Sequence, residues 1–307
     1  MRNKFKQITL ILLFVMLQIQ MSASCNQHEN HNQSKSPIKP IKEKHLIFKP
    51  VIDTLLKKGV DSAYIYKLLD CDETNFDEKY IKINVTGYLK KTDYSHNYNT
   101  RSVQKSKEFL NENIEILKQA EKKYGVNKET IVAILWVETK LGTYLGKNHI
   151  PSVFFSTALV NLPQYIQVNI KELDSLNLDT AKYNQLIEKI HTRSRRKADW
   201  AINELVAMSK IDKKNMLQFH SVYGSWAGAF GMSQFLPSSY YKHAVDGNND
   251  GKIDLFNKED AIFSIANYLK NHGWRQNDVY MQRKSVFAYN NSSAYVDAVF
   301  KLANKLK

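Results

Sequence analysis

Apolar residues recur every three or four positions along most of the chain after residue 45, which is the spacing of one face of a helix. The pattern begins with Ile47, Val51 and Leu55. Few segments show the period-two alternation that strands require. The longer expected helices cover 102–124, 127–142, 183–210 and 258–272, and a short helix starts near 293. The fold is therefore expected to be mainly α.

Residues that begin and end helices support this reading. Asn127 is a suitable N-cap for the second of these helices, and Gly125 and Gly273 stand where helices are expected to stop. The stretch 183–210 is either one long helix or two shorter ones. Residues 224–257 show little periodicity and predict loops.

The N-terminal residues have the pattern of a secretory signal peptide. Basic Arg2, Lys4 and Lys6 precede an apolar run over 10–17, and small residues follow at 22–24. This run is too short for a transmembrane helix, which needs about 20 residues. The predicted organisation is a signal peptide over 1–24, a polar tether over 25–45 and a folded body over 46–307.

The two cysteines leave their own state open. Cys25 directly follows the signal peptide, where a bacterial lipoprotein carries its acylated cysteine. If Cys25 is not lipidated, a disulfide with Cys71 is an alternative in an oxidising compartment. The sequence is thus consistent with an exported protein, in the periplasm or attached to the outer membrane.

The charge of the chain favours an anionic partner. Its formal net charge is +14, and its 44 Lys and Arg residues are spread along the sequence. It has no nucleic-acid motif: neither ribonucleoprotein sequences, nor zinc-finger spacing, nor a sustained basic helix is present. We therefore expect no nucleic-acid partner. The spread charge is mostly typical of a solvated surface, and it also suits an acidic cell-wall polymer.

Glu138 is the strongest candidate for a catalytic residue. With Ile131, Ile134 and Leu135 it falls on one face of the expected helix 127–142, and this face is otherwise apolar. Desolvation and the nearby helix C-terminus both raise the pKa of a carboxyl group. A carboxyl group that stays protonated near neutral pH can act as a general acid. The alternative is a structural glutamate paired with Lys or Arg.

The segment 224–240 combines three glycines in eight residues with Ser225 and Gln234. Glycines allow a backbone to turn tightly and to approach a ligand. The two polar side chains can hydrogen-bond sugar hydroxyl or N-acetyl groups. A purely structural loop explains the composition equally well.

The segment 246–257 resembles the start of an EF-hand calcium loop. Oxygen-bearing side chains stand at positions 1, 3 and 5, a glycine at 6 and a backbone carbonyl at 7. The last position is Asn257 instead of the usual glutamate, so Asn257 is alternatively the N-cap of the next helix. The candidate ligands of a structural calcium are Asp246, Asn248, Asp250, Lys252, Asp254 and Asn257.

Taken in order, five segments resemble the lytic murein transglycosylase B family over about residues 90–305. They are AEKKYGVNKETIVAILWVETKLGTYLG, SRRKADWAINELVAMSK, GSWAGAFGMSQFLPSSYYKHAVDGNNDGKIDLF, DAIFSIANYLKNHGW and YNNSSAYVDAVF. The resemblance implies a lysozyme-like helical domain with a cleft. It also implies non-hydrolytic cleavage of the bond between N-acetylmuramic acid and N-acetylglucosamine in peptidoglycan, leaving 1,6-anhydro ends, with no catalytic cofactor.

The resemblance also assigns residue roles. Glu138 is implied as the single catalytic acid and base, which agrees with the lack of an obvious second catalytic carboxylate. Arg195 and Arg196 match a basic pair expected near the peptide stem. The implied substrate-contacting positions in the cleft are Ser225, Gln234, Tyr268, Tyr289, Asn290 and Tyr94. Tyr268 is alternatively a core aromatic residue, and Tyr289–Ser293 alternatively contains the N-cap of the last helix.

Two departures from the family pattern stand out. About 28 extra residues, roughly 165–192, precede the arginine pair and are expected to form an added helix or a lid over the cleft. The second departure is Asn257 at the last position of the calcium loop, which weakens the expectation of metal binding. Residues 45–90 show no clear match. The alternatives to a transglycosylase are a hydrolytic muramidase on the same scaffold and a peptidoglycan-binding protein without catalysis.

Overall fold

The computed structural model describes residues 43–87 and 93–307, and these residues form one compact unit. The expected signal peptide, Cys25 and most of the expected tether lie outside the described residues. The described part is mainly α-helical, as the sequence predicted, with one pair of two-residue strands. No described helix is long and apolar enough to cross a bilayer.

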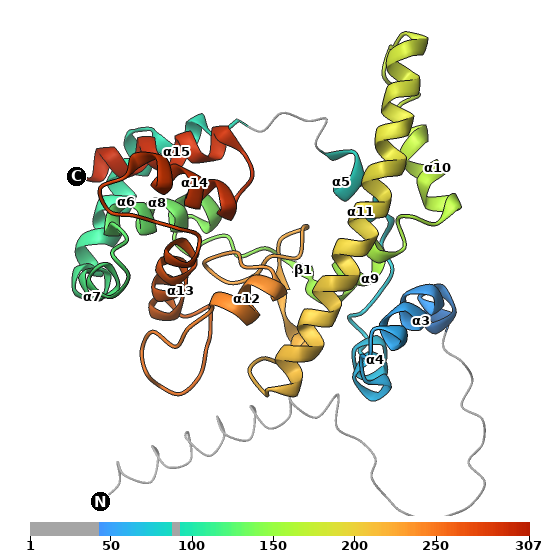
Figure 1. Cartoon of the computed structure of the whole chain (residues 1–307), viewed down its shortest axis with the longest axis horizontal. Coiled ribbons are helices and arrows are strands. Elements are labelled where there is room, and N and C mark those ends of the chain that lie inside the picture. Colours follow the sequence, from blue (N-terminus) through green and yellow to red (C-terminus); the bar gives the residue numbers. More distant parts are fainter. Residues whose placement is uncertain (1–42, 88–92) are drawn as a thin grey trace, which may run out of the picture. The chain divides into compact units, whose positions relative to one another are not determined.

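The elements follow one another along the chain as labelled in Figure 1. The first half contains α2 (Glu43–Ile47), α3 (Lys49–Lys57), α4 (Ser62–Leu69), α5 (Glu78–Val85), the 3-10 helix η2 (Ser95–Tyr98), α6 (Thr100–Glu112), α7 (Ile114–Tyr124), α8 (Lys128–Thr139), β1 (Asn148–His149) and α9 (Ile150–Ala158). The second half contains α10 (Pro163–Lys171), α11 (Thr180–Lys213), the 3-10 helix η3 (Phe219–Ser221), β2 (Tyr223–Gly224), α12 (Pro237–His243), α13 (Lys258–Asn271), α14 (Val279–Tyr289) and α15 (Ser293–Leu306).

Helix α8 lies at the centre of one group of helices. It packs against α15, α6, α13 and α7, and its residues 129–136 are buried on every side. A helix that is apolar all round must be enclosed by other helices. This enclosure fixes the end of α8, where Glu138 lies.

Helix α11 organises a second group. It is a single helix of 34 residues that packs against α9, α12, α10 and α5 (Figure 1). The extra segment 165–192 forms most of α10 and the first turns of α11. Its buried residues Ile166, Leu173, Leu186 and Ile190 join Ile81 and Val85 of α5 in a small separate core. The segment thus adds a helix, which was one of the two structures expected for it.

Some expected boundaries differ from the observed ones. The helix expected over 102–124 is divided at Asn113, whose backbone leaves the helical region (φ −115°, ψ 21°) and whose side-chain amide donates to the carbonyl of Phe109. Residues 43–45, expected in the tether, begin helix α2, and Lys44 donates to the carbonyl of Cys71. Helix α14 was not predicted. Its apolar residues do not gather on one face, so tertiary packing decides its conformation.

The two short strands join the loop that follows α8 to the glycine-rich segment that begins at 224. In the antiparallel pair, Asn148 lies opposite Gly224 and His149 opposite Tyr223. A Cβ atom on Gly146 would lie 2.1 Å from the carbonyl oxygen of Gly224. Only glycine permits this approach, and Gly146 also has a positive φ of 89°. The contact brings the chain after α8 against the glycine-rich segment.

Candidate active site

Glu138 lies in the last turn of α8, and its side chain is partly buried. Ile131, Ile134 and Leu135 share its helix face and are fully buried. The predicted apolar surroundings of this carboxyl group are thus present.

The hydroxyl group of Tyr295 donates a hydrogen bond to Glu138 Oε1 over 2.6 Å. Burial raises the pKa of Glu138 from an ordinary value of 4.5 to about 7, while the Tyr295 hydrogen bond and the positive charge of Lys140 oppose this rise. The predicted direction of the pKa shift is confirmed. In the described part of the chain, the hydrogen-bond partner of Glu138 is a neutral phenol and not a Lys or Arg.

Lys140 follows α8 in the left-handed region, with φ 51°, and Leu141 and Gly142 continue with positive φ. Its ammonium group donates to the side-chain oxygen of Asn97 and lies 5.0 Å from the centre of the Trp136 ring. Burial lowers the pKa of Lys140, although the charge of Glu138 favours its protonated form. The tight turn therefore places a cation beside the acid without a direct ion pair.

Two hydrogen bonds hold the glycine-rich segment, one to the end of α8 and one to the end of α14. The hydroxyl of Thr139 donates to the carbonyl of Met232 over 3.0 Å, and the hydroxyl of Tyr289 donates to the carbonyl of Ser233. Gln234 comes next in the chain, at φ 50°, and its amide donates to the carbonyls of Leu145 and Gly231. The side-chain oxygen of Gln234 remains an acceptor for a ligand.

Ser225 belongs to the same folded loop. Its hydroxyl accepts the amide N–H of Ala229, and its own amide donates to the carbonyl of Ala229. Isolated bridges of Phe230 with Gly224 and with Phe235 close the loop. The segment therefore has the tight turns that its glycines predicted.

Aromatic rings from α13, α14 and the loop pack beside the acid. Tyr289 packs edge-to-face on Tyr268 and at a tilt against Phe235, with ring centroids 4.8 and 5.8 Å away. The charge of Glu138 raises the pKa of Tyr289, although burial is the larger cause. Tyr268 is 8% exposed, and its hydroxyl donates to the carbonyl of Ala288. Tyr268 is thus a core residue in this structure, which was the alternative to its assignment as a cleft residue.

The remaining predicted residues differ in their positions. Tyr94 packs edge-to-face on Tyr295 at 5.9 Å, and the charge of Glu138 contributes to raising its pKa, so it lies in the surroundings of Glu138. Asn290 is the C-cap of α14, immediately after Tyr289. Arg195 and Arg196 are exposed on α11, whose main packing partners are α9, α10, α12, α5 and α3. The arginine pair thus belongs to the second group of helices.

In the expected calcium loop, side chains of the candidate ligands accept hydrogen bonds from backbone amides of the loop itself. Asp246 accepts the amides of Asp250 and Gly251, and Asp250 accepts the amide of Lys252. Asp254 accepts the amide of Phe256. Nowhere in 43–87 or 93–307 do three His, Cys, Asp or Glu side chains gather as a set of metal ligands.

Asn257 departs from its predicted role as a metal ligand. Its side chain accepts the amide of Glu259 as the N-cap of α13, which was the alternative reading. The carboxylate that organises this loop is Asp260, which is 1% exposed and accepts the amides of Gly247 and Asp254.

Sequence reasoning also missed the role of Tyr295. This residue stands in the quoted segment YNNSSAYVDAVF, where Ser292 caps α15 by accepting the amide of Tyr295. The cap was predicted, but no local signal connects Tyr295 to an acid 157 residues away.

Residues 47–286 match the family described as "Transglycosylase SLT domain". The chain belongs to this family. The match includes α8, the glycine-rich loop, Tyr94 and Tyr268, and it ends at Val286 in α14.

Similar proteins include the membrane-bound lytic murein transglycosylase B of Escherichia coli K12, which is 34% identical over 177 residues. That alignment spans 58% of this chain and 40% of the relative, so it covers less than half of the relative's length.

Two solved structures share the fold. Escherichia coli lytic transglycosylase SLT35 in complex with calcium has a TM-score of 0.63 at 22% identity, covering 84% of this chain and 92% of the other. Pseudomonas aeruginosa SltB3 in complex with NAG-anhNAM-pentapeptide has a TM-score of 0.64 at 19% identity, covering 86% and 80%. These similarities confirm the mainly α, lysozyme-like fold class.

Proposed function

We propose that this family member is a peptidoglycan lytic transglycosylase with Glu138 as its catalytic acid. It would cleave the bond between N-acetylmuramic acid and N-acetylglucosamine without water. The name of the 34%-identical relative and the peptidoglycan fragment bound to SltB3 support this substrate class.

The observation that carries the proposal is a carboxyl group with a pKa of about 7 whose hydrogen-bond partner is a phenol. At neutral pH a large share of Glu138 is protonated, so it can donate a proton to the glycosidic oxygen. As the proton leaves, a carboxylate forms. The Tyr295 hydroxyl and the Lys140 charge both favour this anion and would stabilise it in the transition state.

The surroundings of Glu138 also support a mechanism with one carboxylate. Glycosidases that use water or a covalent intermediate generally need a second Asp or Glu close to the sugar. Within the described residues, the charge that shifts the pKa of Glu138 is the cation Lys140, and no Asp or Glu contributes. The same Glu138 would therefore accept the proton of the muramic acid C6 hydroxyl as this oxygen attacks C1. An intramolecular hydroxyl group has a high effective concentration and can outcompete water.

The substrate would lie along the residues gathered beside Glu138. Ser225 and Gln234 would hydrogen-bond the sugar substituents. The loop that carries them is held by the Thr139–Met232 hydrogen bond to the helix end that bears Glu138, which supports this assignment. Tyr94, Tyr289 and Asn290 would line the cleft, and Tyr268 would act by supporting Tyr289. Arg195 and Arg196, exposed on α11, would meet the carboxylates of peptide stems away from the bond that is cleaved.

The loop 246–254 fits a hard cation such as calcium by its donor types. The candidate ligands in these nine residues include three carboxylates and the amide oxygen of Asn248, and Gly251 has the positive φ of 86° that a sharp loop requires. Asp246, Asn248, Asp250, Asp254 and the carbonyl of Lys252 would hold the ion, which would supply structural cross-linking and no catalytic step. Asn257 is used as a helix cap. The related structure in complex with calcium supports the proposal.

The protein would act outside the cytoplasm. The signal-peptide pattern over 1–24 and the membrane-bound relative support export to the periplasm or the outer membrane. A lipid on Cys25 would supply the membrane attachment. Cys25→Ser would then release the protein from membranes, and unchanged fractionation would contradict lipidation.

The test is digestion of purified peptidoglycan by the wild-type protein and by Glu138→Gln. The wild type is expected to release soluble muropeptides, and the variant is expected to release none while keeping its helical circular dichroism. Release of muropeptides by the variant would overturn the role of Glu138.

A further inference from the structure

Lys140 occupies a backbone position that normally suits glycine. It is the C-cap of α8 in the left-handed region, with φ 51° and ψ 50°, and its amide donates to the carbonyl of Trp136 over 3.0 Å. Helices that end in this conformation usually have glycine there, because a Cβ atom disfavours it. The lysine side chain is therefore present at a cost to the fold, and its contacts show what it contributes.

Three neutral groups hold the ammonium group of Lys140. It donates to the side-chain oxygen of Asn97 and, over 3.3 Å, to the carbonyl of Trp136, and it lies 5.0 Å from the centre of the Trp136 ring. In the part of the chain that the structure describes, it forms no ion pair with a carboxylate. The positive charge is thus fixed in place without being neutralised.

Asn97 lies in the 3-10 helix η2 and is only 1% exposed. Its backbone amide donates to the carbonyl of Tyr94 over 3.0 Å, and its side-chain amide donates to the same carbonyl over 3.2 Å. Because the side-chain nitrogen is used in this way, the side-chain oxygen is the atom that faces Lys140. The orientation of the amide is therefore set by η2 itself.

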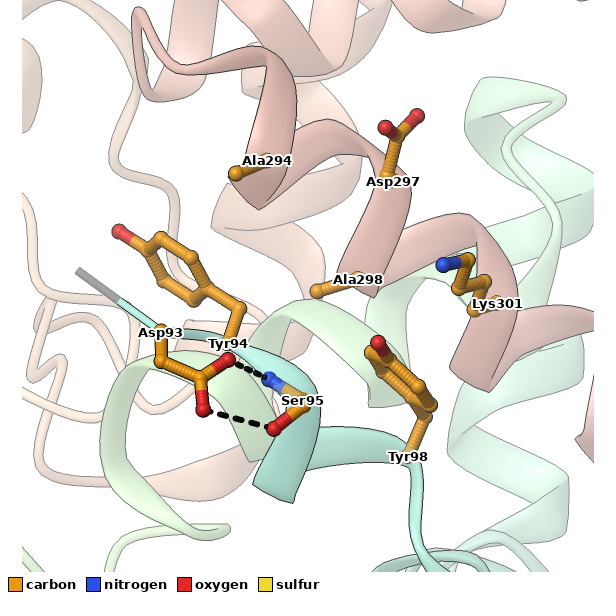
Figure 2. Close-up of a pocket in the computed structure, with 8 residues that line it drawn as sticks. All are labelled: Asp93, Tyr94, Ser95, Tyr98, Ala294, Asp297, Ala298 and Lys301. Carbon is orange, nitrogen blue, oxygen red and sulfur yellow. Dashed lines mark hydrogen bonds between the residues drawn. The ribbon is translucent and has the colours of Figure 1, made fainter. Parts of the chain in front are cut away.

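Contacts at both ends hold η2. At its start, the carboxylate of Asp93 accepts hydrogen bonds from the amide and the hydroxyl of Ser95, as the dashed lines in Figure 2 show. At its end, the hydroxyl of Ser102 in α6 donates to the carbonyl of His96 over 2.8 Å. Asn97 thus presents its oxygen from a fixed support.

The charge held by Asn97 acts on the acid. Lys140 lowers the pKa of Glu138 against the larger effect of burial. The other titratable groups that face this carboxyl group are tyrosines from α15, α14 and the residue before η2, and burial raises the pKa of each: Tyr295, Tyr289 and Tyr94. These phenols are neutral near pH 7. Among these described neighbours, Lys140 is thus the one that carries a charge.

We propose that Asn97 is a positioning residue, which holds the ammonium group of Lys140 beside Glu138 as a cation without a counter-ion. A neutral amide suits this task, because it fixes the ammonium group and leaves its charge intact. A carboxylate at the same place would cancel the charge. This role rests on the proposed function, in which Glu138 is the catalytic acid and becomes a carboxylate as it gives up its proton.

The first test measures the pKa of Glu138 directly, by carbon-13 NMR of the protein with labelled glutamate carboxyl groups. The resonance of Glu138 is the one that disappears in Glu138→Gln. Lys140→Gly removes the cation, and Asn97→Asp supplies a carboxylate that neutralises it. Because the cation lowers this pKa, both variants are expected to raise the midpoint by about one unit, the smaller end of the effect of a neighbouring charge.

Two results would contradict this. Unchanged midpoints in both variants would overturn the proposal, and a shift in Lys140→Gly alone would overturn the role of Asn97.

A purely structural role would give a different pattern. Glycine suits the left-handed turn, so Lys140→Gly is expected to keep or raise the thermal midpoint while it shifts the pKa of Glu138. Ser102→Ala is the matched control, because it removes another hydrogen bond that holds η2. It is expected to lower the thermal midpoint and to leave the pKa of Glu138 unchanged. A pKa shift in this control as large as in Asn97→Asp would overturn the specific role of Asn97.

The second test is the pH profile of kcat/KM on peptidoglycan. The alkaline limb should move upward in Lys140→Gly and Asn97→Asp by the amount that the NMR midpoint moves. A limb that stays in place although the NMR midpoint moves would overturn a role of the pair in catalysis.

The two tests also separate this inference from the proposed function. If the wild type does not cleave peptidoglycan, the transglycosylase activity fails, while the NMR titration still decides whether Asn97 and Lys140 act on Glu138. If cleavage occurs but the NMR midpoints do not move, only the present inference fails.

Discussion

The Tyr295 hydroxyl donates to the Glu138 carboxyl group over 2.6 Å, although the two residues are 157 positions apart in the chain. The bond joins α15 to α8, which pack closely along their lengths. It lowers the pKa of Glu138 against the larger effect of burial. Tyr295 therefore moderates the pKa of Glu138, and in the proposed reaction it would stabilise the carboxylate that remains after proton transfer.

Tyr295→Phe should raise the pKa of Glu138 above about 7, because it removes a hydrogen bond that lowers this pKa. The alkaline limb of the kcat/KM profile should move to higher pH, and the plateau should fall about tenfold, since a hydrogen bond to a charged group contributes about 1.5–3 kcal/mol. Tyr280→Phe, at an exposed residue of α14, is the control. An unchanged midpoint in Tyr295→Phe would contradict this role.

Glu138→Gln should make the protein more stable at pH 8 than the wild type, but not at pH 4. The folded pKa of about 7 exceeds the ordinary value of 4.5, so the wild type loses stability as the pH rises between these values. A shift of this size corresponds to about 1–3 kcal/mol after allowance for the partial exposure of Glu138. Urea unfolding at the two pH values measures the difference, and equal effects at both would contradict burial of the charge.

Asp246→Ala should lower the thermal midpoint in calcium more than in chelator, because the proposed ion stabilises the folded state only where its ligands are present. Asp179→Ala removes a comparable carboxylate that caps α11, so it should lower the midpoint equally in both conditions. Scanning calorimetry of both variants makes the comparison. Equal losses for Asp246→Ala in both conditions would argue for a metal-free turn.

Gly146→Ala should reduce both stability and cleavage. Its Cβ would lie 2.1 Å from the Gly224 carbonyl oxygen, so the loop carrying Ser225 would have to move. Gly125→Ala is the matched control, because Gly125 also has positive φ (69°) but no atom within 4 Å of the added Cβ. The control should cost about 1 kcal/mol and keep activity. Gly146→Ala should cost at least about 1 kcal/mol more, and equal behaviour of the two variants would contradict the close contact.

The sequence predicted what local patterns determine. The apolar spacing around Glu138 predicted its helix, its burial and the direction of its pKa shift, because these depend on neighbours three to seven positions away. Glycines predicted the tight turns of 224–231. The Ser292 and Asn257 caps were available as alternatives because N-caps are short-range features.

Contacts between residues far apart in the sequence could not be predicted from these local patterns. No spacing rule connects Tyr295 to Glu138, Tyr289 to Ser233 or Asp260 to the amide of Gly247, since each bond joins segments that meet only after folding. The break at Asn113 was missed because the apolar pattern continues across it. Tyr268 matches a cleft residue by position, yet in the fold its hydroxyl is used by the carbonyl of Ala288.

The most direct test of the central claim is mass spectrometry of the muropeptides released from purified peptidoglycan by the wild-type protein. If Glu138 directs the C6 hydroxyl in place of water, the products will carry 1,6-anhydro ends and be lighter by one water than the products of hydrolysis. Products with reducing ends, formed by the addition of water, would contradict the transglycosylase mechanism and make the protein a hydrolase.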